Sequence, residues 1–216
     1  VTQNGLFTGF TAMLLAMPLF LPLTMAVVSG DTIAGEAGLG TLRYLLIAPV
    51  GRARLLVVKY LGTLVFALVG TFVLMIAGAV IGAILFPVGP VTLLSGDVIQ
   101  IPEAFGRMAL VALYTTISMM GMLALGLFIS TLTSIPVGAM TGVLIASGVS
   151  QILDNLPQLA WLHEWLFTHY WLDFADILRQ PVELGSLGSN LILQLGYVAV
   201  FFALAYGRLA SKDILS

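Results

Sequence analysis

Long runs without a single charged residue alternate with short polar segments along the chain. No Asp, Glu, Lys or Arg occurs before residue 31, or within residues 60–96, 108–153 and 184–207. Each run exceeds the roughly 20 apolar residues that an α-helix needs to cross a hydrocarbon core of about 30 Å. The pattern therefore predicts an all-α integral membrane protein, a polytopic helical bundle.

Five membrane helices account for these runs. As one helix rising about 1.5 Å per residue, the run 108–153 would be about twice too long for a single crossing. Two spans are expected to meet at Pro136, because the residue before a proline disfavours helix and proline suits a first helical turn. Pro18 and Pro22 are expected to bend the first span. The predicted spans are residues 6–29, 55–86, 107–131, 135–153 and 188–208, in one transmembrane domain of residues 1–216.

Basic residues are concentrated on one side of this predicted bundle. Six of the eight Lys and Arg residues lie in residues 30–59 or in the C-terminal tail, which five spans place on the same side. The excess of basic residues in cytoplasmic loops assigns that side, and the C-terminus, to the cytoplasm. The loop 30–54 is then cytoplasmic, and segments 87–106 and 154–187 are extracellular. Residue 1 would lie outside the cell, which predicts a further span before it.

Composition narrows the classes of function. Hydrophobic residues make up 60% of the 216 residues and charged residues only 8%, against about 25% charged residues in a soluble domain. No basic patch suggests a nucleic-acid partner. The absence of cysteine excludes disulfides, thiolate metal sites and thiol catalysis. The predicted spans carry no buried ionisable group, which argues against a proton relay or a voltage sensor.

Small residues recur at the spacing that brings membrane helices close together. Gly78 and Gly82 are four residues apart, as are Gly138 and Gly142. Such spacing predicts close packing between helices of this chain, with a dimer face as the alternative.

The cytoplasmic loop contains a short pattern with one apolar face. Gly35, Gly38 and Gly40 are expected to prevent the first helix from continuing. Thr41 is a candidate N-cap, and a two-turn apolar face follows it at helical spacing. The face consists of Leu42, Leu45, Leu46 and Pro49. Such a helix either rests on lipid headgroups or docks into a groove on a soluble partner, with leucines as anchors and basic residues at the rim.

The same segment resembles the first cytoplasmic loop of type-2 ABC exporter permeases. The family pattern is G-E, three residues, G-T-L, two residues, L-L, two residues, P, two residues, R, a leucine and a later lysine. It is matched from Gly35-Glu36 through Arg52 to Lys59. The short basic ending after the last span also resembles this family. These permeases usually have six spans, so the chain would contain spans two to six.

The resemblance implies a division of labour. A separate ABC-type ATPase subunit would bind ATP and Mg and hydrolyse the ATP, whereas this chain would bind no cofactor, perform no catalysis and act as the permease. A second permease copy, identical or homologous, would complete the path through the lipid bilayer. The short helix would be the coupling helix in a groove of the ATPase. The implied coupling residues are Glu36, Gly40, Thr41, Leu42, Arg43, Leu45, Leu46, Pro49 and Arg52.

The second extracellular segment is rich in aromatic residues. His163 and His169 are six residues apart, whereas two zinc ligands on one helical face need a spacing of four, so no metal site is expected. Trp161, Trp165 and Trp171 indicate an interfacial or re-entrant helical segment, because indole rings favour the membrane interface. By resemblance this segment caps the translocation path. The three tryptophans are therefore candidates for a structural anchor or for an outer gate.

Other polar residues of the outer segments suggest no special chemistry. The pairs Glu103–Arg107 and Asp176–Arg179 have the spacing of ordinary surface ion pairs on helices. Asp154 and Asn155 are expected to be solvated residues at a helix end, with a place in the lining of a path as the alternative.

The sequence as a whole predicts a multi-pass permease subunit of an ABC exporter in the plasma membrane of a bacterium or an archaeon. Two alternatives remain open at this point. One is a secondary transporter or channel that works without an ATPase. The other is a membrane scaffold that recruits a cytoplasmic protein through the helix at residues 41–49.

Overall fold

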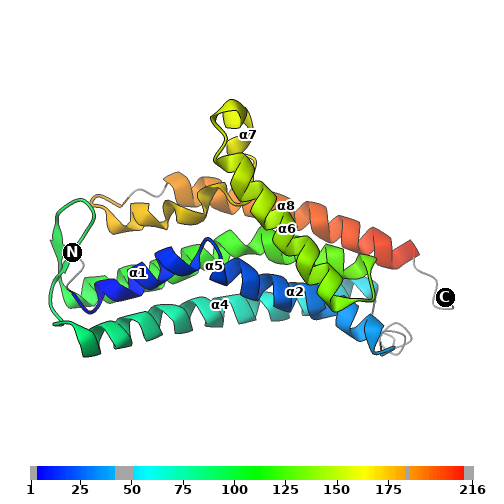
Figure 1. The fold of residues 1–216 in the computed structure, drawn as a ribbon, viewed down its shortest axis with the longest axis horizontal. Coiled ribbons are helices and arrows are strands. Elements are labelled where there is room, and N and C mark those ends of the chain that lie inside the picture. The colour runs from blue at the N-terminus through cyan, green and yellow to red at the C-terminus, as the bar shows by residue number, and fades with distance from the viewer. Residues whose placement is uncertain (1–3, 42–50, 183–184, 212–216) are drawn as a thin grey trace. The chain divides into compact units, whose positions relative to one another are not determined.

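Helices make up most of the described structure. The computed structural model describes residues 4–41, 51–182 and 185–211. The helices, drawn in Figure 1, are α1 (Phe7–Ala16), α2 (Phe20–Gly38), α4 (Arg52–Leu85), α5 (Ile101–Leu132), α6 (Pro136–Asp154), α7 (Ala160–His163) and α8 (Gly185–Ser211). Two 3₁₀ helices, η1 (Pro157–Leu159) and η2 (His169–Leu178), and the strands β1 (Val91–Thr92) and β2 (Val98–Ile99) complete the fold.

Several helices are long and apolar enough to cross a membrane. Among the described residues these are α4, α5, α6 and α8, and α1 with α2 makes a fifth if this bent pair is one span. The chain is thus an all-α protein whose helices are compatible with a multi-pass membrane protein.

Prolines mark the helix breaks that the sequence predicts. The first apolar run is interrupted at Pro18 between α1 and α2, and Pro22 lies in the first turn of α2. Helix α6 begins at Pro136, and Ile135 before it is extended, with φ −110° and ψ 104°. This is the conformation that a following proline imposes, so the predicted break between the third and fourth spans is confirmed.

The expectation that glycines stop the first helix is wrong for Gly35 but confirmed for Gly40, which follows the end of the helix with φ +71°. Helix α2 continues through Gly35 to Gly38. One glycine inside a helix costs only about 1 kcal/mol relative to alanine, and packing outweighs that cost here. A Cβ at Gly30 would lie 2.8 Å from the backbone nitrogen of Met140, and one at Gly38 would lie 2.8 Å from the carbonyl of Ser134. Glycine therefore lets α2 lie close to α6 and to the residues that precede it.

Helix α5 also extends beyond its predicted bounds. It begins at Ile101 rather than at residue 107, so that Arg107 lies inside a helix. The connection before α5 forms a small antiparallel hairpin, in which Val91 pairs with Ile99. Gly96, with φ +92°, occupies the left-handed conformation at its turn.

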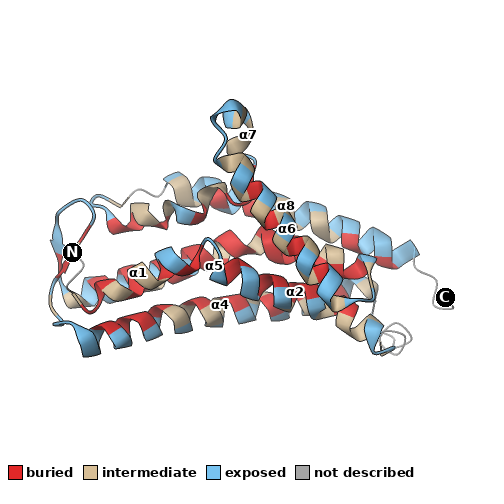
Figure 2. Cartoon of the chain, in the orientation of Figure 1, coloured by how far each residue is buried: buried red, intermediate tan, exposed pale blue. Residues whose placement is uncertain are grey.

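The described residues divide into two compact units. The first unit comprises Val1–Leu21, Phe66–Ser118 and Tyr170–Ile192, and the second comprises Pro22–Val65, Met119–His169 and Leu193–Ser216. Buried positions are most frequent on α5, as Figure 2 shows. In its most apolar window 72% of α5 is buried, against 11% of α8. Helix α8 therefore presents mostly apolar side chains to its surroundings, as a lipid-facing helix does.

Close helix packing in the first unit depends on small residues. A Cβ at Gly78 would lie 3.0 Å from the Cα of Gly9, and a Cβ at Gly82 would collide with the carbonyl of Gly5. The prediction that this glycine pair serves packing within the chain is confirmed. For the pair Gly138 and Gly142 in the second unit the prediction is wrong: a Cβ at Gly138 would meet nothing within 4 Å, and one at Gly142 would be in ordinary contact with Ile129 at 3.4 Å.

Candidate functional site

The end of α2 positions the first residues of the loop that the sequence singles out. The backbone N–H of Thr41 donates to the carbonyl of Glu36 at 3.0 Å, and that of Gly40 donates to Ala37 at 3.1 Å. With Gly40 at φ +71°, this is a Schellman motif. The motif ends the helix and turns Thr41 back toward the side chain of Glu36.

Three side chains then meet in what we call the Glu36 cluster, formed by Glu36, Thr41 and Lys59. The hydroxyl of Thr41 donates to Oε2 of Glu36 at 2.6 Å. The ammonium of Lys59, on α4, donates to Oε1 at 2.9 Å. Both carboxylate oxygens are thereby engaged, and the carboxylate joins the residue just before segment 42–50 to the helix that follows it.

The electrostatics of the Glu36 cluster favour a positioning role. A carboxylate near the C-terminus of a helix is opposed by the helix dipole, and the ammonium of Lys59 offsets this repulsion. The side chains of Glu36 and Lys59 are 31% and 26% exposed. An ion pair this accessible contributes at most about 1 kcal/mol to stability. The cluster therefore fixes local geometry more than it stabilises the fold.

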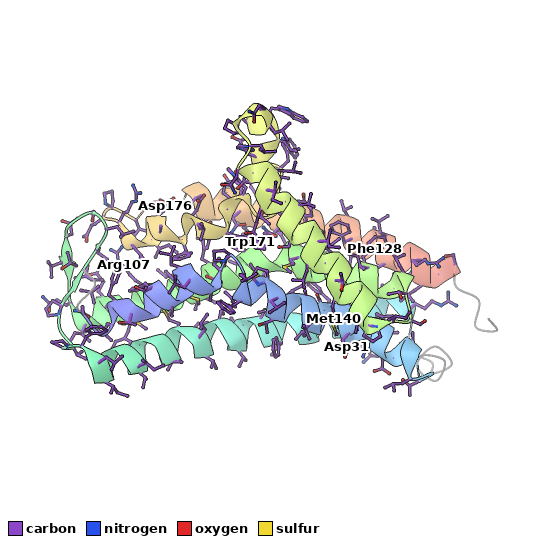
Figure 3. The ribbon with its side chains drawn as sticks, viewed as in Figure 1. Asp31, Arg107, Phe128, Met140, Trp171 and Asp176 are labelled. Carbon is purple, nitrogen blue, oxygen red and sulfur yellow. The ribbon has the colours of Figure 1, made fainter. Side chains whose placement is uncertain are left out.

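A hollow of about 770 Å³ lies beside the Glu36 cluster in the second unit. Its polar lining includes Asp31 as well as Glu36 and Lys59, and its apolar lining includes Leu39 and Pro136. Figure 3 labels Asp31, which is exposed on α2. Two carboxylates facing one ammonium give the hollow a formal charge of −1.

The other flank of the loop is held by Arg52. Its guanidinium donates to the carbonyls of Leu209 at 2.5 Å and Ala210 at 2.7 Å. The last carbonyls of a helix lack partners within the helix, so Arg52 caps the C-terminus of α8. Both flanks of segment 42–50 are thus attached to helices of the second unit.

Only some of the coupling residues implied by the resemblance can be located. Glu36, Gly40 and Thr41 lie together at the end of α2, and Arg52 begins α4. The remaining residues fall outside the described part of the chain, as does the predicted helix they belong to: Leu42, Arg43, Leu45, Leu46 and Pro49.

The three candidate gate tryptophans have different environments. Trp161 and Trp165, in the second unit, are 74% and 68% exposed. Trp171, labelled in Figure 3, belongs to the first unit and is only 2% exposed. The structure therefore does not gather the three indoles on one accessible surface, and their role as an outer gate stays a prediction.

Hydrogen bonds hold the segment that carries Trp161 and Trp165 against its own unit. Tyr197 donates from its hydroxyl to the carbonyl of Trp165 at 2.8 Å. His169 Nδ1 lies 2.7 Å from Oδ1 of Asp154. Asp154 lies at the helix end as expected, but its side chain is only 21% exposed, and its carboxylate ties the start of η2 to the end of α6.

No metal site emerges from these histidines in the described residues. The rings of His163 and His169 are 6.0 Å apart. Among the described residues no group of three His, Cys, Asp or Glu side chains is placed to hold a metal ion.

In the first unit, buried side chains hold η2 against α5 through hydrogen bonds. Trp171 donates from Nε1 to the carbonyl of Ser118 at 3.0 Å, and Tyr114 donates to the carbonyl of Tyr170 at 2.7 Å. Along α5, Ser118 lies about 16 Å from Arg107 at 1.5 Å per residue. The contacts of η2 with α5 thus extend about 16 Å along that helix, and the re-entrant character of this segment stays a prediction.

Arg107 is buried, in contrast to the surface residue that its spacing from Glu103 predicts. The predicted surface pair with Glu103 exists, at 3.0 Å, but the side chain of Arg107 is only 7% exposed. Its guanidinium donates to the carbonyls of Ile177 at 2.6 Å and Arg179 at 2.8 Å. A buried charge must be fully paired, and these carbonyls at the end of η2 provide the partners. By contrast, Arg179 meets Asp176 at 3.7 Å with 57% of its side chain exposed, as a surface pair does.

Two contacts of charged residues are not among the sequence predictions, although the sequence contains signals for them. Lys59 matched the family pattern but was not assigned to the site, and it supplies the partner charge of Glu36. Arg107 borders an uncharged run of 46 residues, and an arginine beside so apolar a stretch is expected to be partly buried and to need buried hydrogen-bond acceptors.

Comparisons with known proteins give the family. The chain is similar to "Uncharacterized protein YhcI" of Bacillus subtilis (strain 168), with 25% identity over 200 residues. The match covers 87% of this chain and 63% of that protein, so the chain spans less than two thirds of the relative's length. A family model matches residues 1–215. The chain belongs to the family described as "Protein of unknown function (DUF2705)".

Proposed function

We propose that this chain is the permease subunit of a type-2 ABC exporter. In this proposal a separate ATPase subunit binds ATP and Mg, and the chain couples ATP hydrolysis to movement of a substrate across the membrane. The loop between α2 and α4 and the C-terminus lie in the cytoplasm. The protein is a multi-pass component of the plasma membrane of a bacterium or an archaeon, and a second permease copy, identical or homologous, completes the path.

The Glu36 cluster is the observation that carries the proposal. The loop with the permease-like pattern begins and ends at residues that side chains attach to the helices: Thr41 through Glu36, and Arg52 through the end of α8. Force applied to a loop held at both ends reaches the helices, whereas a free loop would absorb it. Such attachment is what a segment needs if it is to transmit movement from an ATPase to spans.

The apolar helices support the transport part of the proposal. Among the described residues, four helices, or five if the bent pair α1 and α2 is one span, are long and apolar enough to form a membrane bundle. The leucines of the loop would dock into an apolar groove on the soluble ATPase. The exposed apolar face of α8 leaves surface for lipid or for a second permease copy.

Purification from the native membrane tests the proposal directly. We expect an ABC-type ATPase subunit to be recovered with the chain, and its ATP hydrolysis to be faster with the chain than without it. Recovery of the chain without any ATPase would contradict the proposal and favour a secondary transporter or a channel. An ATPase that binds but whose turnover ignores the chain would favour a membrane scaffold.

A matched pair of variants locates the docking surface. Leu45→Asp and Leu46→Asp are expected to abolish co-purification of the ATPase, because a carboxylate would be desolvated in an apolar groove. Tyr44→Asp, on the other side of the predicted helix, is expected to retain the ATPase. Equal recovery of the ATPase with all three variants would exclude this segment as the docking element.

A further inference from the structure

An apolar groove of about 430 Å³ opens on the surface of the first unit. Its floor includes Met75 and Met108, which are 2% and 5% exposed, and its rims include Ile76, Val80 and Phe105, which are more than half exposed. All eleven lining residues are Ala, Val, Leu, Ile, Met or Phe. A concave site of this size falls in the range of small-molecule pockets, but it offers no polar group to orient a ligand.

The groove follows from how α4 packs. One face of α4 presents Gly78 and Gly82 to the residues of and before α1, at backbone contact. The next rows of side chains around the helix, spaced four residues apart, line the groove. One row begins at Phe72 and the other ends at Ala83, and α5 forms the opposite wall. Side chains along these rows thus line a groove that runs parallel to the axis of α4.

The length of the groove matches one leaflet of a bilayer. The eleven-residue step from Phe72 to Ala83 corresponds to about 16 Å along α4. This is close to half of a hydrocarbon core of about 30 Å, which is the depth that one acyl chain occupies. Helix α4 is long and apolar enough to cross a membrane, so acyl chains surround this surface once the protein is in a bilayer.

We propose that the groove binds one acyl chain of a membrane lipid. The wholly apolar lining complements a hydrocarbon chain and offers nothing to a headgroup. Met75 and Met108 are unbranched and flexible, so the floor adapts to the bends of a bound chain. Bound there, the acyl chain of the lipid fills the space between α4 and α5 in the leaflet nearer the connection 87–100.

The size of the groove argues against a protein as its occupant. A stable protein interface uses about 20 to 30 residues on each side, whereas eleven residues line this groove. The lipid proposal rests on the placement of the protein in a bilayer and not on the proposed transport function. The two proposals can therefore fail independently. Recovery of an ATPase without a lipid in the groove would contradict only the lipid proposal, and a bound lipid without an ATPase would contradict only the transport proposal.

Native mass spectrometry of the detergent-solubilised protein tests this proposal. The probes are palmitoyl-oleoyl phosphatidylglycerol, palmitoyl-oleoyl phosphatidylcholine and the short-chain dihexanoyl phosphatidylcholine. We expect one retained molecule of either long-chain lipid, with equal retention of the two headgroups, and no retention of the short-chain lipid. No retained long-chain lipid, or retention that follows the headgroup, would overturn the proposal.

Two variants fill the groove from opposite walls. Ala83→Leu on α4 and Ala109→Leu on α5 are expected to lower lipid retention at least about tenfold, because each displaces several methylene groups of the bound chain. Val73→Leu, on an exposed part of α4 outside the groove, is the matched control and is expected to retain the lipid. Retention equal to that of the control in either correctly folded filling variant would contradict the proposal. So would loss of a dimer in these variants while the lipid remains bound.

Discussion

Arg107 in the first unit and Glu36 in the second are charged residues with similar tasks and very different surroundings. Each connects a helix to a segment distant in sequence. Arg107 is 7% exposed and donates to two backbone carbonyls and to Glu103. Glu36 is 31% exposed and accepts from Thr41 and Lys59. The difference in burial decides what each residue contributes.

Water can replace the contacts of Glu36 but not those of Arg107. A buried carbonyl that loses its donor carries the full cost of desolvation, whereas an accessible carboxylate is solvated again when its partner leaves. The arginine therefore stabilises the fold of the first unit. The glutamate joins Thr41 to Lys59 with little effect on the stability of the fold.

The largest effect on stability is expected for Arg107→Met. This substitution leaves the carbonyls of Ile177 and Arg179 without their donor and should lower the free energy of unfolding by about 2–4 kcal/mol. Reversible unfolding in mixed micelles measures this change. Arg179→Met, which removes an exposed pair, is the control and should cost less than about 0.5 kcal/mol. Equal losses in both variants would remove the distinction between buried and exposed charges.

A smaller effect is expected for Trp171→Phe. The variant loses the hydrogen bond to Ser118 and part of the buried volume, and it should be destabilised by about 1–3 kcal/mol in the same unfolding measurement. Trp161→Phe should change the stability by less than about 0.5 kcal/mol, because Trp161 is 74% exposed. If Trp161→Phe proved the more destabilising of the two, the assignment of Trp171 as the buried strap would be wrong.

The smallest effect on stability is expected for Glu36→Gln. Because the ion pair with Lys59 is accessible to solvent, the free energy of unfolding should fall by less than about 1 kcal/mol. Asp31→Asn, on the same helix and outside the Glu36 cluster, should have no measurable effect. If Glu36→Gln lowered the free energy of unfolding as much as Arg107→Met, Glu36 would be as important for stability as Arg107. The proposed difference between the two residues would then be wrong.

The parts of the fold that depend on local chemistry were predictable from the sequence. The break at Pro136 follows from the steric effect of proline on its neighbour, and the apolar runs follow from the thickness of a bilayer. The packing of Gly78 against α1 was predictable from the spacing of small residues alone. Each of these inferences needs only a few neighbouring residues.

The parts that depend on distant partners were not predictable. Arg107 bonds to a carbonyl 70 residues away, and without that partner its spacing from Glu103 indicates only a surface pair. Gly35 remains helical because α2 packs on other helices, and the intrinsic helix propensity of a residue contains no information about such packing. Trp171 and Trp161 are equivalent in the sequence, and only the burial of η2 distinguishes them. In the candidate site the resemblance identified Glu36, but its physical role became clear only with Lys59 beside it.

The central claim is that the Glu36 cluster positions a loop that couples this chain to an ATPase. The most direct test is the rate of ATP hydrolysis by the ATPase subunit, recovered with the chain and reconstituted with charge-reversed variants. Glu36→Lys and Lys59→Glu alone place like charges together and should abolish stimulation of the ATPase. The double variant restores opposite charges and should recover part of the stimulation. Wild-type stimulation in both single variants, or no recovery in a double variant that folds normally, would contradict the claim.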